Sequence, residues 1–190
     1  MRSTQFVSRA GEKLAFALQQ FHLSVAGKIC ADFGSSTGGF VDCLIKNNAE
    51  KVYAVETGYG VLDWKLRNDE RVVVKERTNA MHITLPEKVD LITNDTSWTR
   101  QEIIFPNILK NLENEGSILT LIKPHYEADK KLLHKGVLDP QTAKKVATDV
   151  TKRLAYLFPV SFINMVQSPI LGGKGGNTEY LALFQKTSLA

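Results

Sequence analysis

Long apolar runs, frequent cysteine and metal-binding spacings are all missing from this chain of 190 residues. No apolar run approaches the roughly 18 residues that a membrane-spanning helix needs, and the first residues lack the apolar core of a secretory signal. The four histidines show no ligand spacing with one another or with cysteine, which argues against the common zinc motifs. These absences predict a cytoplasmic protein that uses neither a membrane nor a resident metal.

Cys30 and Cys43 are the two cysteines of the chain. They fall in a predicted strand and a predicted helix around a glycine-rich turn, where a thiol packs as a small apolar side chain. Such a pair does not make a disulfide framework, so we expect both thiols to be buried and free.

The excess of positive charge is small, because 24 Lys and Arg residues against 20 Asp and Glu residues give a formal charge of +4. That number alone fits an ordinary solvated surface as well as a surface that binds a polyanion. The basic residues gather in three stretches that could form a phosphate-binding face: Arg2, Arg9 and Lys13; Lys65, Arg67, Arg71, Lys75 and Arg77; and Lys130, Lys131 and Lys135.

The most informative stretch reads ADFGSSTGGF and occupies positions 31–40. A short apolar run typical of a buried strand precedes the glycines, and the apolar residues over 40–45 fit a helix. Glycines let the backbone turn sharply and let a ligand approach the main chain, while the helix N-terminus presents unpaired N–H groups. The stretch therefore predicts a site for a nucleotide-like cofactor.

Strand-like and helix-like segments alternate along the chain. Apolar runs predict strands over 28–33, 52–55, 72–74, 89–95, 118–122, 160–166 and 180–184. Helical spacing predicts helices over 8–21, 40–48, 62–66, 103–112 and 139–157, with a polar loop over 124–136. Such units specify an α/β fold with an open, largely parallel, doubly wound, Rossmann-like sheet that helices cover on both faces. We expect one domain over 1–190, with a helical N-terminal extension over 1–27 and a glycine-rich hairpin or mobile flap over 168–177.

Two of the predicted helices carry further signals. Ser8 is expected to cap the first helix, because its hydroxyl can accept from the first backbone N–H groups. The helix after Asp139 starts with a proline, which favours a helix start. One face of that helix is expected to be buried, and its residues are Ala143, Val146, Ala147, Val150, Leu154 and Leu157.

Four polar side chains fall where predicted strands end, namely Asp32, Glu56, Asp95 and Lys123. Ligands of parallel sheets bind at the carboxyl ends of the strands, so we expect these side chains to converge on one rim. Taken singly, an Asp at a strand end is often a helix cap and a lone Lys is usually a solvated charge.

Glu56 and Asp32 bear on which cofactor such a rim would bind. A carboxylate in the place of Glu56 can accept hydrogen bonds from two ribose hydroxyls, in dinucleotide enzymes and adenosylmethionine enzymes alike. The turn does not match G-x-G-x-x-G, and Asp32 would repel a pyrophosphate but could hold a cationic amino-acid group directly or through water. These features favour S-adenosylmethionine over NAD, with a tight turn that binds no ligand as the structural alternative.

Seven segments, in order, carry a resemblance to a known family. They are VSRAGEKL at 7–14, the glycine turn through position 44, VYAV at 52–55, GYGVLDWKLR at 58–67, ERTNA at 76–80, KPHYE at 123–127 and GNTEY at 176–180. Together they resemble the TlyA family of haemolysin-like proteins, which act as ribosomal RNA 2′-O-methyltransferases with an FtsJ-like catalytic domain. The resemblance covers nearly the whole chain.

The resemblance implies a mixed seven-stranded sheet with the last strand antiparallel, and a Lys-Asp-Lys-Glu tetrad at Lys13, Asp95, Lys123 and Glu179. It also implies ribosomal RNA or a ribosomal subunit as partner, and it leaves the methylated nucleotide and the oligomeric state open. It assigns S-adenosylmethionine to Asp32, Gly34, Ser35, Ser36, Thr37, Gly38, Gly39, Phe40, Glu56, Asn79 and Asp95.

The chemistry of a ribose acceptor suits such a tetrad. A ribose hydroxyl is a poor nucleophile near neutral pH, so a positioned base must remove its proton as the methyl sulfonium is attacked. A lysine can be that base only if its pKa is lowered, which a second ammonium and partial burial would do. Lys123 is the expected base, with Lys13 assisting it or orienting the hydroxyl. Asp95 and Glu179 are expected to hold the lysines, and Asp95 also to help hold the methyl donor.

The chain departs from the family at three points. Trp98 stands where relatives commonly have Phe, and His125 with Tyr126 stands where they commonly have Gln with Phe. Both changes keep an aromatic side chain near the rim, where it could stack on a base. Relatives usually carry a small N-terminal RNA-binding domain of the ribosomal-protein type, whereas only a few residues precede Phe6 here, which leaves site selection open.

Two other functions remain as alternatives. The first is a catalytically idle module that binds RNA or ribosomes and keeps the methyltransferase fold. The second is a membrane-active cytolysin, as the haemolysin name suggests, although the chain has no apolar run long enough to span a bilayer.

Overall fold

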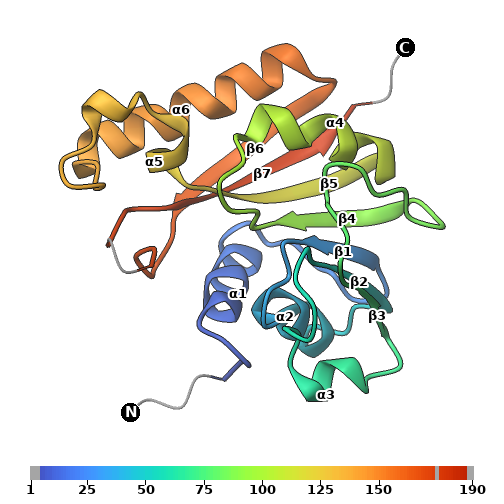
Figure 1. Ribbon diagram of the computed structural model, residues 1–190. Coiled ribbons are helices and arrows are strands. Elements are labelled where there is room, and N and C mark those ends of the chain that lie inside the picture. Colours follow the sequence, from blue (N-terminus) through green and yellow to red (C-terminus); the bar gives the residue numbers. More distant parts are fainter. Residues whose placement is uncertain (1–4, 174–175, 188–190) are drawn as a thin grey trace.

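The computed structural model describes residues 5–173 and 176–187, and Figure 1 shows a central sheet with helices on both faces. The strands are β1 (Ile29–Phe33), β2 (Lys51–Val55), β3 (Val72–Lys75), β4 (Val89–Asn94), β5 (Leu112–Ile122), β6 (Val160–Gln167) and β7 (Tyr180–Lys186). The helices are α1 (Ala10–Gln20), α2 (Gly39–Lys46), α3 (Trp64–Arg67), α4 (Gln101–Asn111), α5 (Pro124–Glu127) and α6 (Pro140–Leu157), with a 3-10 turn over Lys130–Leu132. Arg2, one of the expected phosphate-binding residues, lies outside the described residues.

The seven strands form one sheet in the order β3-β2-β1-β4-β5-β7-β6. Strands β1 to β5 pair in parallel, whereas β7 runs antiparallel to both of its neighbours. The predicted doubly wound α/β fold is confirmed, together with the reversed last strand that the family resemblance implies. The order of the sheet reverses between β1 and β4, and this point is where ligands of such sheets bind.

The sheet packs against its helices through two hydrophobic cores, one on each face. Alternate residues of a strand point to opposite faces, so Ala31 and Phe33 of β1 pack in the core with α4 and α6, while Cys30 packs with α1 and α2. In Figure 1, α4 and α6 lie above the sheet, and α1 and α2 lie below it. Cys30 and Cys43 are buried and free, as expected, and burial raises the pKa of each thiol to about 12.

Strand β5 is much longer than the run over 118–122 that the sequence predicts. It begins at Leu112, which we expected to lie in the preceding helix. Helix α4 instead stops at Asn111, whose side chain accepts a hydrogen bond from the Leu85 amide at 2.8 Å. Because Leu112 then pairs with Val89 of β4, strand pairing overrides the helical spacing of the apolar residues.

Smaller differences concern the segments after β5. The predicted polar loop over 124–136 contains α5 and the 3-10 turn, and the Asp129 side chain caps that turn. Leu157, expected on the buried face of α6, is 50% exposed because the helix ends there. Strands β6 and β7, which the segment over 168–177 joins, pair antiparallel, as a hairpin requires. Positions 174 and 175 of the expected hairpin or flap lie outside the described residues.

Helix α1 begins without the expected cap, since Arg9 and not Ser8 occupies the N-cap position, and the Arg9 side chain makes no capping hydrogen bond. Ser8 instead lies against α2. Its Oγ is so near Gly39 that a Cβ added to this glycine would come within 2.2 Å of it. A Cβ on Gly11 would come within 2.4 Å of the Phe6 ring and 2.8 Å of the Gly39 carbonyl oxygen. The two glycines therefore let α1 and α2 cross closely, and this crossing fixes the position of Lys13 on α1.

We expect Gly11→Ala to destabilise the protein by about 1–3 kcal/mol, because the added methyl group overpacks the crossing of α1 and α2. The gain in helix propensity, at most about 1 kcal/mol, acts in the opposite direction. Urea unfolding measures the difference. The control is Gln19→Ala on the exposed face of α1, with an expected change within about 0.5 kcal/mol. A Gly11→Ala protein as stable as the wild type would show that the crossing is not tight.

Candidate active site

The glycine turn leads from β1 into α2 at the switch point of the sheet. Gly34 has φ +85°, and a Cβ there would come within 3.1 Å of the backbone of Asp95 and Thr96. A glycine at this position therefore lets the loop after β4 approach the turn. Gly38, with φ +96°, precedes α2 and faces Leu66 of α3. Gly38 thus serves the packing of α3, and it lines none of the pockets described below.

A hollow of about 110 Å³ opens beside the turn, and we call it the turn hollow. Its walls are Ser8, Ala10, Asp32, Gly34, Ser35, Ser36, Thr37, Gly39, Phe40 and Asp95. Ser35 Oγ is buried without a hydrogen-bond partner in the described part of the chain, and Asp32 is 1% exposed. A buried carboxyl group and an unpaired hydroxyl beside a glycine turn make a cradle for a small polar or cationic group.

Asp32 is the most perturbed acid of the site. Its pKa is raised to about 8, chiefly because the carboxyl group is buried and also because Asp95 and Glu56 lie nearby. Thr93 donates a hydrogen bond to Asp32 Oδ1 at 2.7 Å, which opposes the shift. A cation that enters the turn hollow would favour the ionised form of Asp32.

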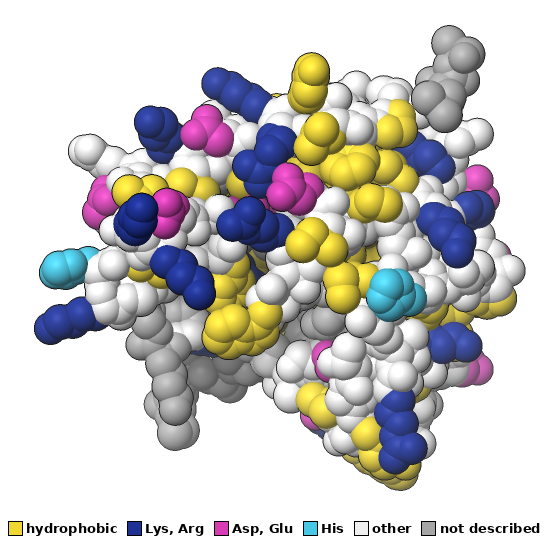
Figure 2. All heavy atoms as spheres, turned by 45° about the horizontal axis from the view of Figure 1, so that its top comes forward, with side chains coloured by type: hydrophobic (Ala, Val, Ile, Leu, Met, Phe, Trp, Pro, Cys, Tyr) yellow, Lys and Arg dark blue, Asp and Glu magenta, His cyan; other side chains and the backbone are white. Residues whose placement is uncertain are grey.

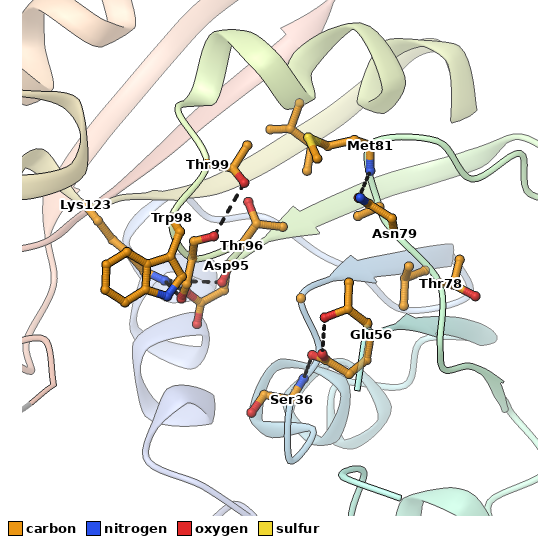
Figure 3. Close-up of a pocket in the computed structure, with 16 residues that line it drawn as sticks. Ser36, Glu56, Thr78, Asn79, Met81, Asp95, Thr96, Trp98, Thr99 and Lys123 are labelled. Carbon is orange, nitrogen blue, oxygen red and sulfur yellow. Dashed lines mark hydrogen bonds and ion pairs between the residues drawn. The ribbon is translucent and has the colours of Figure 1, made fainter. Parts of the chain in front are cut away.

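A larger pocket of about 440 Å³, which we call the rim pocket, adjoins the turn hollow (Figure 3). It is lined by Gly34, Ser36, Val55, Glu56, Thr57, Thr78, Asn79, Ala80, Met81, Asp95, Thr96, Ser97, Trp98, Thr99, Ile104 and Lys123. Figure 3 shows Glu56 on one side of the pocket and Asp95 with Lys123 on the other. Three of the four predicted strand-end residues therefore share one pocket, and Asp32 lies in the adjoining hollow.

Glu56 follows β2 and is held by three hydrogen-bond donors. Oε2 accepts from Ser36 N at 3.0 Å, and Oε1 accepts from Gly58 N at 2.8 Å and from Thr57 Oγ1 at 3.0 Å. Burial by itself would raise the pKa of Glu56, but these hydrogen bonds outweigh it and lower the pKa. An ionised acceptor of fixed orientation thus faces the rim pocket.

Glu76 organises the loop after Glu56, and the sequence analysis assigned it no role. Its carboxylate accepts from the Gly60 amide at 2.9 Å and the Val61 amide at 3.1 Å, and it pairs with Arg67. The hydrogen bond from Gly60, followed by that from Arg67, lowers the pKa of Glu76 to about 2. Its only signal in the sequence is its place in the ERTNA segment.

Lys123 and Asp95 form an ion pair at the rim pocket. Lys123 Nζ lies 2.6 Å from Asp95 Oδ1, with the two side chains 11% and 22% exposed. The same ammonium donates to Ser97 Oγ at 3.0 Å and to the Asp95 carbonyl oxygen at 3.3 Å. Three oxygens from the loop after β4 therefore hold the amine of a residue at the end of β5.

A second ion pair is more deeply buried. Lys13 Nζ on α1 lies 2.5 Å from Glu179 Oε2, just before β7, and the side chains are 8% and 5% exposed. A Cβ on Gly172 would come within 2.2 Å of Glu179 Oε1, so the loop before β7 closes over this carboxylate. One member of each pair lines a hollow of about 230 Å³, the lysine hollow, whose walls are Ser97, Lys123, His125, Tyr126, Gly172, Gly173, Asn177 and Glu179. The structure thus brings the four residues of the implied tetrad together as two ion pairs.

Three rings cluster beside the lysine hollow, and two of them, His125 and Tyr126, line it. The ring centroids of Trp98 and Tyr126 are 5.0 Å apart, and those of His125 and Tyr126 are 4.1 Å apart. Burial lowers the pKa of His125 against the opposing effect of Glu179, and Lys123 lowers it further. All three rings also line a groove of about 1180 Å³, the aromatic groove, whose other walls are Arg100, Ile103, Ala128, Asp129, Lys130, Leu133 and Gly136.

Every residue expected to hold a cofactor, apart from Gly38, lines the rim pocket or the turn hollow. Sequence reasoning missed Thr93 as the hydrogen-bond donor to Asp32. The alignment of the two predicted strands was a usable signal, because Thr93 of β4 stands opposite Asp32 of β1. Thr93 itself lines neither pocket, and the wall residues that sequence reasoning left without a site role include Ser8, Ala10, Thr57, Thr78, Met81, Thr96 and Ser97.

Within 5–173 and 176–187, no group of three or more His, Cys, Asp or Glu side chains is placed to hold a metal ion. No helix in these ranges is both long and apolar enough to cross a membrane.

A glycine turn at the switch point of the sheet, with an acid after β2 and a pocket between them, is typical of Rossmann-like methyltransferases. The N-methyltransferase NodS from Bradyrhizobium japonicum, solved with S-adenosyl-L-homocysteine, shares the fold with a TM-score of 0.65 at 14% identity, over 93% of this chain and 87% of its own. This likeness concerns the fold. The chain belongs to the FtsJ-like methyltransferase family, whose model matches residues 6–186.

Similar proteins carry two kinds of name. Hemolysin A from Brachyspira hyodysenteriae is 42% identical over 97% of this chain and 78% of its own length. The 16S/23S rRNA (cytidine-2′-O)-methyltransferase TlyA from Mycobacterium tuberculosis is 40% identical over 92% of this chain but only 66% of its own length. The crystal structure of a candidate hemolysin from Lactococcus lactis has a TM-score of 0.90 at 38% identity, over 97% of this chain and 90% of its own.

We expect Asp32→Asn to stabilise the protein relative to wild type by an amount that grows with pH. The pKa of about 8 in the folded state lies above the ordinary value of 3.8, so folding favours the protonated acid. The stability that this proton contributes is complete below the unfolded-state pKa and is lost as the pH rises through about 8. Between these limits the difference should grow by up to about 1.4 kcal/mol per pH unit.

Urea unfolding at several pH values between 4 and 9 measures this difference. Asp69→Asn is the control, because hydrogen bonds from Arg71 lower the pKa of Asp69. Removing the Asp69 carboxylate should therefore destabilise the protein, and the destabilisation should increase as the pH rises above the acidic range. A difference between Asp32→Asn and wild type that does not vary with pH would contradict the shifted acid.

Proposed function

We propose that this chain transfers a methyl group from S-adenosylmethionine to the 2′-hydroxyl of a ribose in ribosomal RNA. The observation that carries the proposal is the meeting of two ion pairs, Lys123 with Asp95 and Lys13 with Glu179, beside the rim pocket. The rim pocket and the lysine hollow share Lys123 and Ser97 as walls, so a donor in one and an acceptor in the other would meet there. The name of the relative TlyA supports ribosomal RNA as acceptor, which would place the reaction in the cytoplasm.

The residues around the turn suit S-adenosylmethionine, which supplies a methyl group on an electrophilic sulfonium. Asp32 suits the ammonium of the amino-acid part, because a buried carboxyl group gains most from a cationic neighbour. Glu56 suits the two ribose hydroxyls, since its carboxylate is ionised and oriented by Ser36 and Gly58. Asn79 lies in the same pocket, where its Oδ1 accepts from the Met81 amide at 2.9 Å.

Lys123 is the proposed general base. The ribose oxygen would bond to the methyl carbon as the methyl–sulfur bond breaks and its electron pair goes to sulfur. The hydroxyl proton would pass to Lys123 Nζ, once the lysine has released its own proton to solvent. Asp95 and Ser97 orient that amine from 2.6 and 3.0 Å. Lys13, held by Glu179, is proposed to orient the attacking hydroxyl by donating a hydrogen bond to its oxygen.

The aromatic groove beside the lysine hollow suits single-stranded RNA. Trp98 is 84% exposed, and exposed aromatic rings stack on unpaired bases. Arg100 and Lys130 line the aromatic groove, where they could pair with phosphates.

Figure 2 shows Lys and Arg side chains interspersed with hydrophobic patches on the face that it presents. The basic stretch around Arg67 and Arg71 adds less positive charge than the sequence suggests, because both side chains pair with carboxylates.

We expect Lys123→Met to lower methyl incorporation into ribosomal subunits by at least about 100-fold, because the base is lost. Binding of S-adenosylmethionine should change far less, since Asp32 and Glu56, the proposed cofactor ligands, are unchanged. The control is Lys88→Met, which removes an exposed lysine at the opposite end of β4 and should leave incorporation unchanged. Equal incorporation by wild type and Lys123→Met would rule out the assigned base.

We expect Glu56→Gln to weaken S-adenosylmethionine binding by about tenfold or more, because neutral acceptors make weaker hydrogen bonds than carboxylates. Titration calorimetry measures the change. Glu87→Gln is the matched control, because Glu87 is also a hydrogen-bonded, ionised acid, paired with Lys51 at 2.8 Å, but it precedes β4 at the other end of the sheet. If both variants bind the cofactor as wild type does, Glu56 is not a cofactor ligand.

The same measurements separate the alternatives. A catalytically idle module would bind ribosomal RNA in a salt-dependent way while showing no heat of binding with S-adenosylmethionine. The name of the Brachyspira relative raises a lytic activity, which a lysis assay with the purified chain would reveal. Lysis that survives Lys123→Met would then belong to a function separate from methyl transfer.

A further inference from the structure

We propose that Gln101 is a positioning residue for the pair formed by Asp95 and Lys123, and that it acts through a buried polar network joining the ends of β4 and β5. This inference rests on the proposed function for its effect on rate. The network itself stands on contacts in the structure.

The side chain of Gln101 sits at the centre of this network. Its Oε1 accepts a hydrogen bond from Thr120 Oγ1 at 2.6 Å and one from Asn94 Nδ2 at 3.1 Å. Its Nε2 donates to the Leu121 carbonyl oxygen at 3.3 Å. Asn94 Nδ2 also donates to Thr120 Oγ1 at 2.9 Å. Gln101 is 2% exposed, and Asn94 and Thr120 are fully buried, so these bonds are shielded from water.

The partners of Gln101 flank both residues of the catalytic pair. Asn94 immediately precedes Asp95, and its Oδ1 accepts from Thr96 Oγ1 at 3.0 Å on the other side of that acid. Leu121 belongs to β5 and lies two positions before Lys123, which follows the end of that strand. A single side chain therefore connects the backbone on either side of the 2.6 Å contact between Asp95 and Lys123.

The backbone of Gln101 extends the same connection beyond Lys123. Its amide donates to Glu127 Oε1 at 2.7 Å, so an acid of α5 caps the N-terminus of α4, whose own cap position provides no side-chain bond. Glu127 Oε2 in turn accepts from Arg153 of α6 at 3.1 Å, and the Glu127 side chain is 2% exposed. Lys123 is thereby bracketed by Leu121 before it and Glu127 after it, both bonded to one residue.

The loop that carries Asp95 needs such support. It includes Trp98, a non-glycine residue with φ +64° that is 84% exposed, so little packing besides the contact with the Tyr126 ring holds it. A fully satisfied buried network is rigid because every broken bond leaves an unpaired polar group in a dry interior. Displacement of a catalytic group by about 1 Å can cost up to about 100-fold in rate.

Thr120 offers the sharpest test, because Thr120→Val removes the hydroxyl at nearly constant volume, whereas Thr120→Ser keeps it. The matched control is Thr151→Val on α6, since Thr151 is also buried and hydrogen-bonded, to the Thr148 carbonyl oxygen at 2.9 Å. Each variant of the 190-residue chain is assayed for kcat and KM with ribosomal subunits and for the Kd of S-adenosylmethionine. Hydrogen exchange is followed in peptides covering 94–100 and 121–128.

We expect Thr120→Val to lower kcat about tenfold or more, with KM and Kd within about threefold of wild type, and to speed exchange in both peptides. Thr120→Ser should recover most of the rate and the slow exchange. Thr151→Val should resemble wild type in both readouts.

The inference is overturned if Thr120→Val matches Thr151→Val in rate and exchange. It is also overturned if Thr120→Ser is as impaired as Thr120→Val, because shape and not the hydroxyl would then matter. If the wild type transfers no methyl group, the proposed function fails. The exchange data then decide by themselves whether the network couples the two segments.

Discussion

The ion pair between Lys13 and Glu179 is the interaction on which the candidate site most depends. It joins α1 to the segment before β7 across 166 positions of sequence, and both side chains are almost inaccessible to water. Two buried charges of opposite sign persist only together, because removing either one leaves an uncompensated charge that costs several kcal/mol. The crossing at Gly11 fixes one partner, and the loop at Gly172 closes over the other. The first helix and the last strand of the fold therefore meet beside Lys123.

Around the glycine turn, two carboxyl groups differ in protonation state. Glu56 is ionised because backbone amides donate to it, whereas Asp32 keeps its proton up to about pH 8 because it is buried near two other acids. Environment, and not side-chain chemistry, makes the difference. This contrast suits a ligand with a cation at one end and hydroxyl groups further along, which is the character of the methyl donor proposed here.

The rim of the sheet was predictable to a considerable extent. Carboxyl ends of parallel strands meet at one edge whatever the details of packing, so Asp32, Asp95 and Lys123 could be placed together from strand pattern alone. Leu112 was misassigned because its helical spacing competes with strand pairing, and pairing depends on β4, which lies far away in sequence. Ser8 has the right chemistry for a cap, but its hydroxyl lies against α2, and no local pattern records that contact.

The sequence by itself determined the alternation of strands and helices, the glycine turn and the polar residues at the strand ends, because each depends on spacing over a few neighbouring residues. Only the tertiary structure decided which charges pair, which acid keeps its proton, and that Gln101 links the segments carrying Asp95 and Lys123. Those properties depend on burial and on distances between segments remote in sequence. Electrostatic and hydrogen-bond energies change steeply with both.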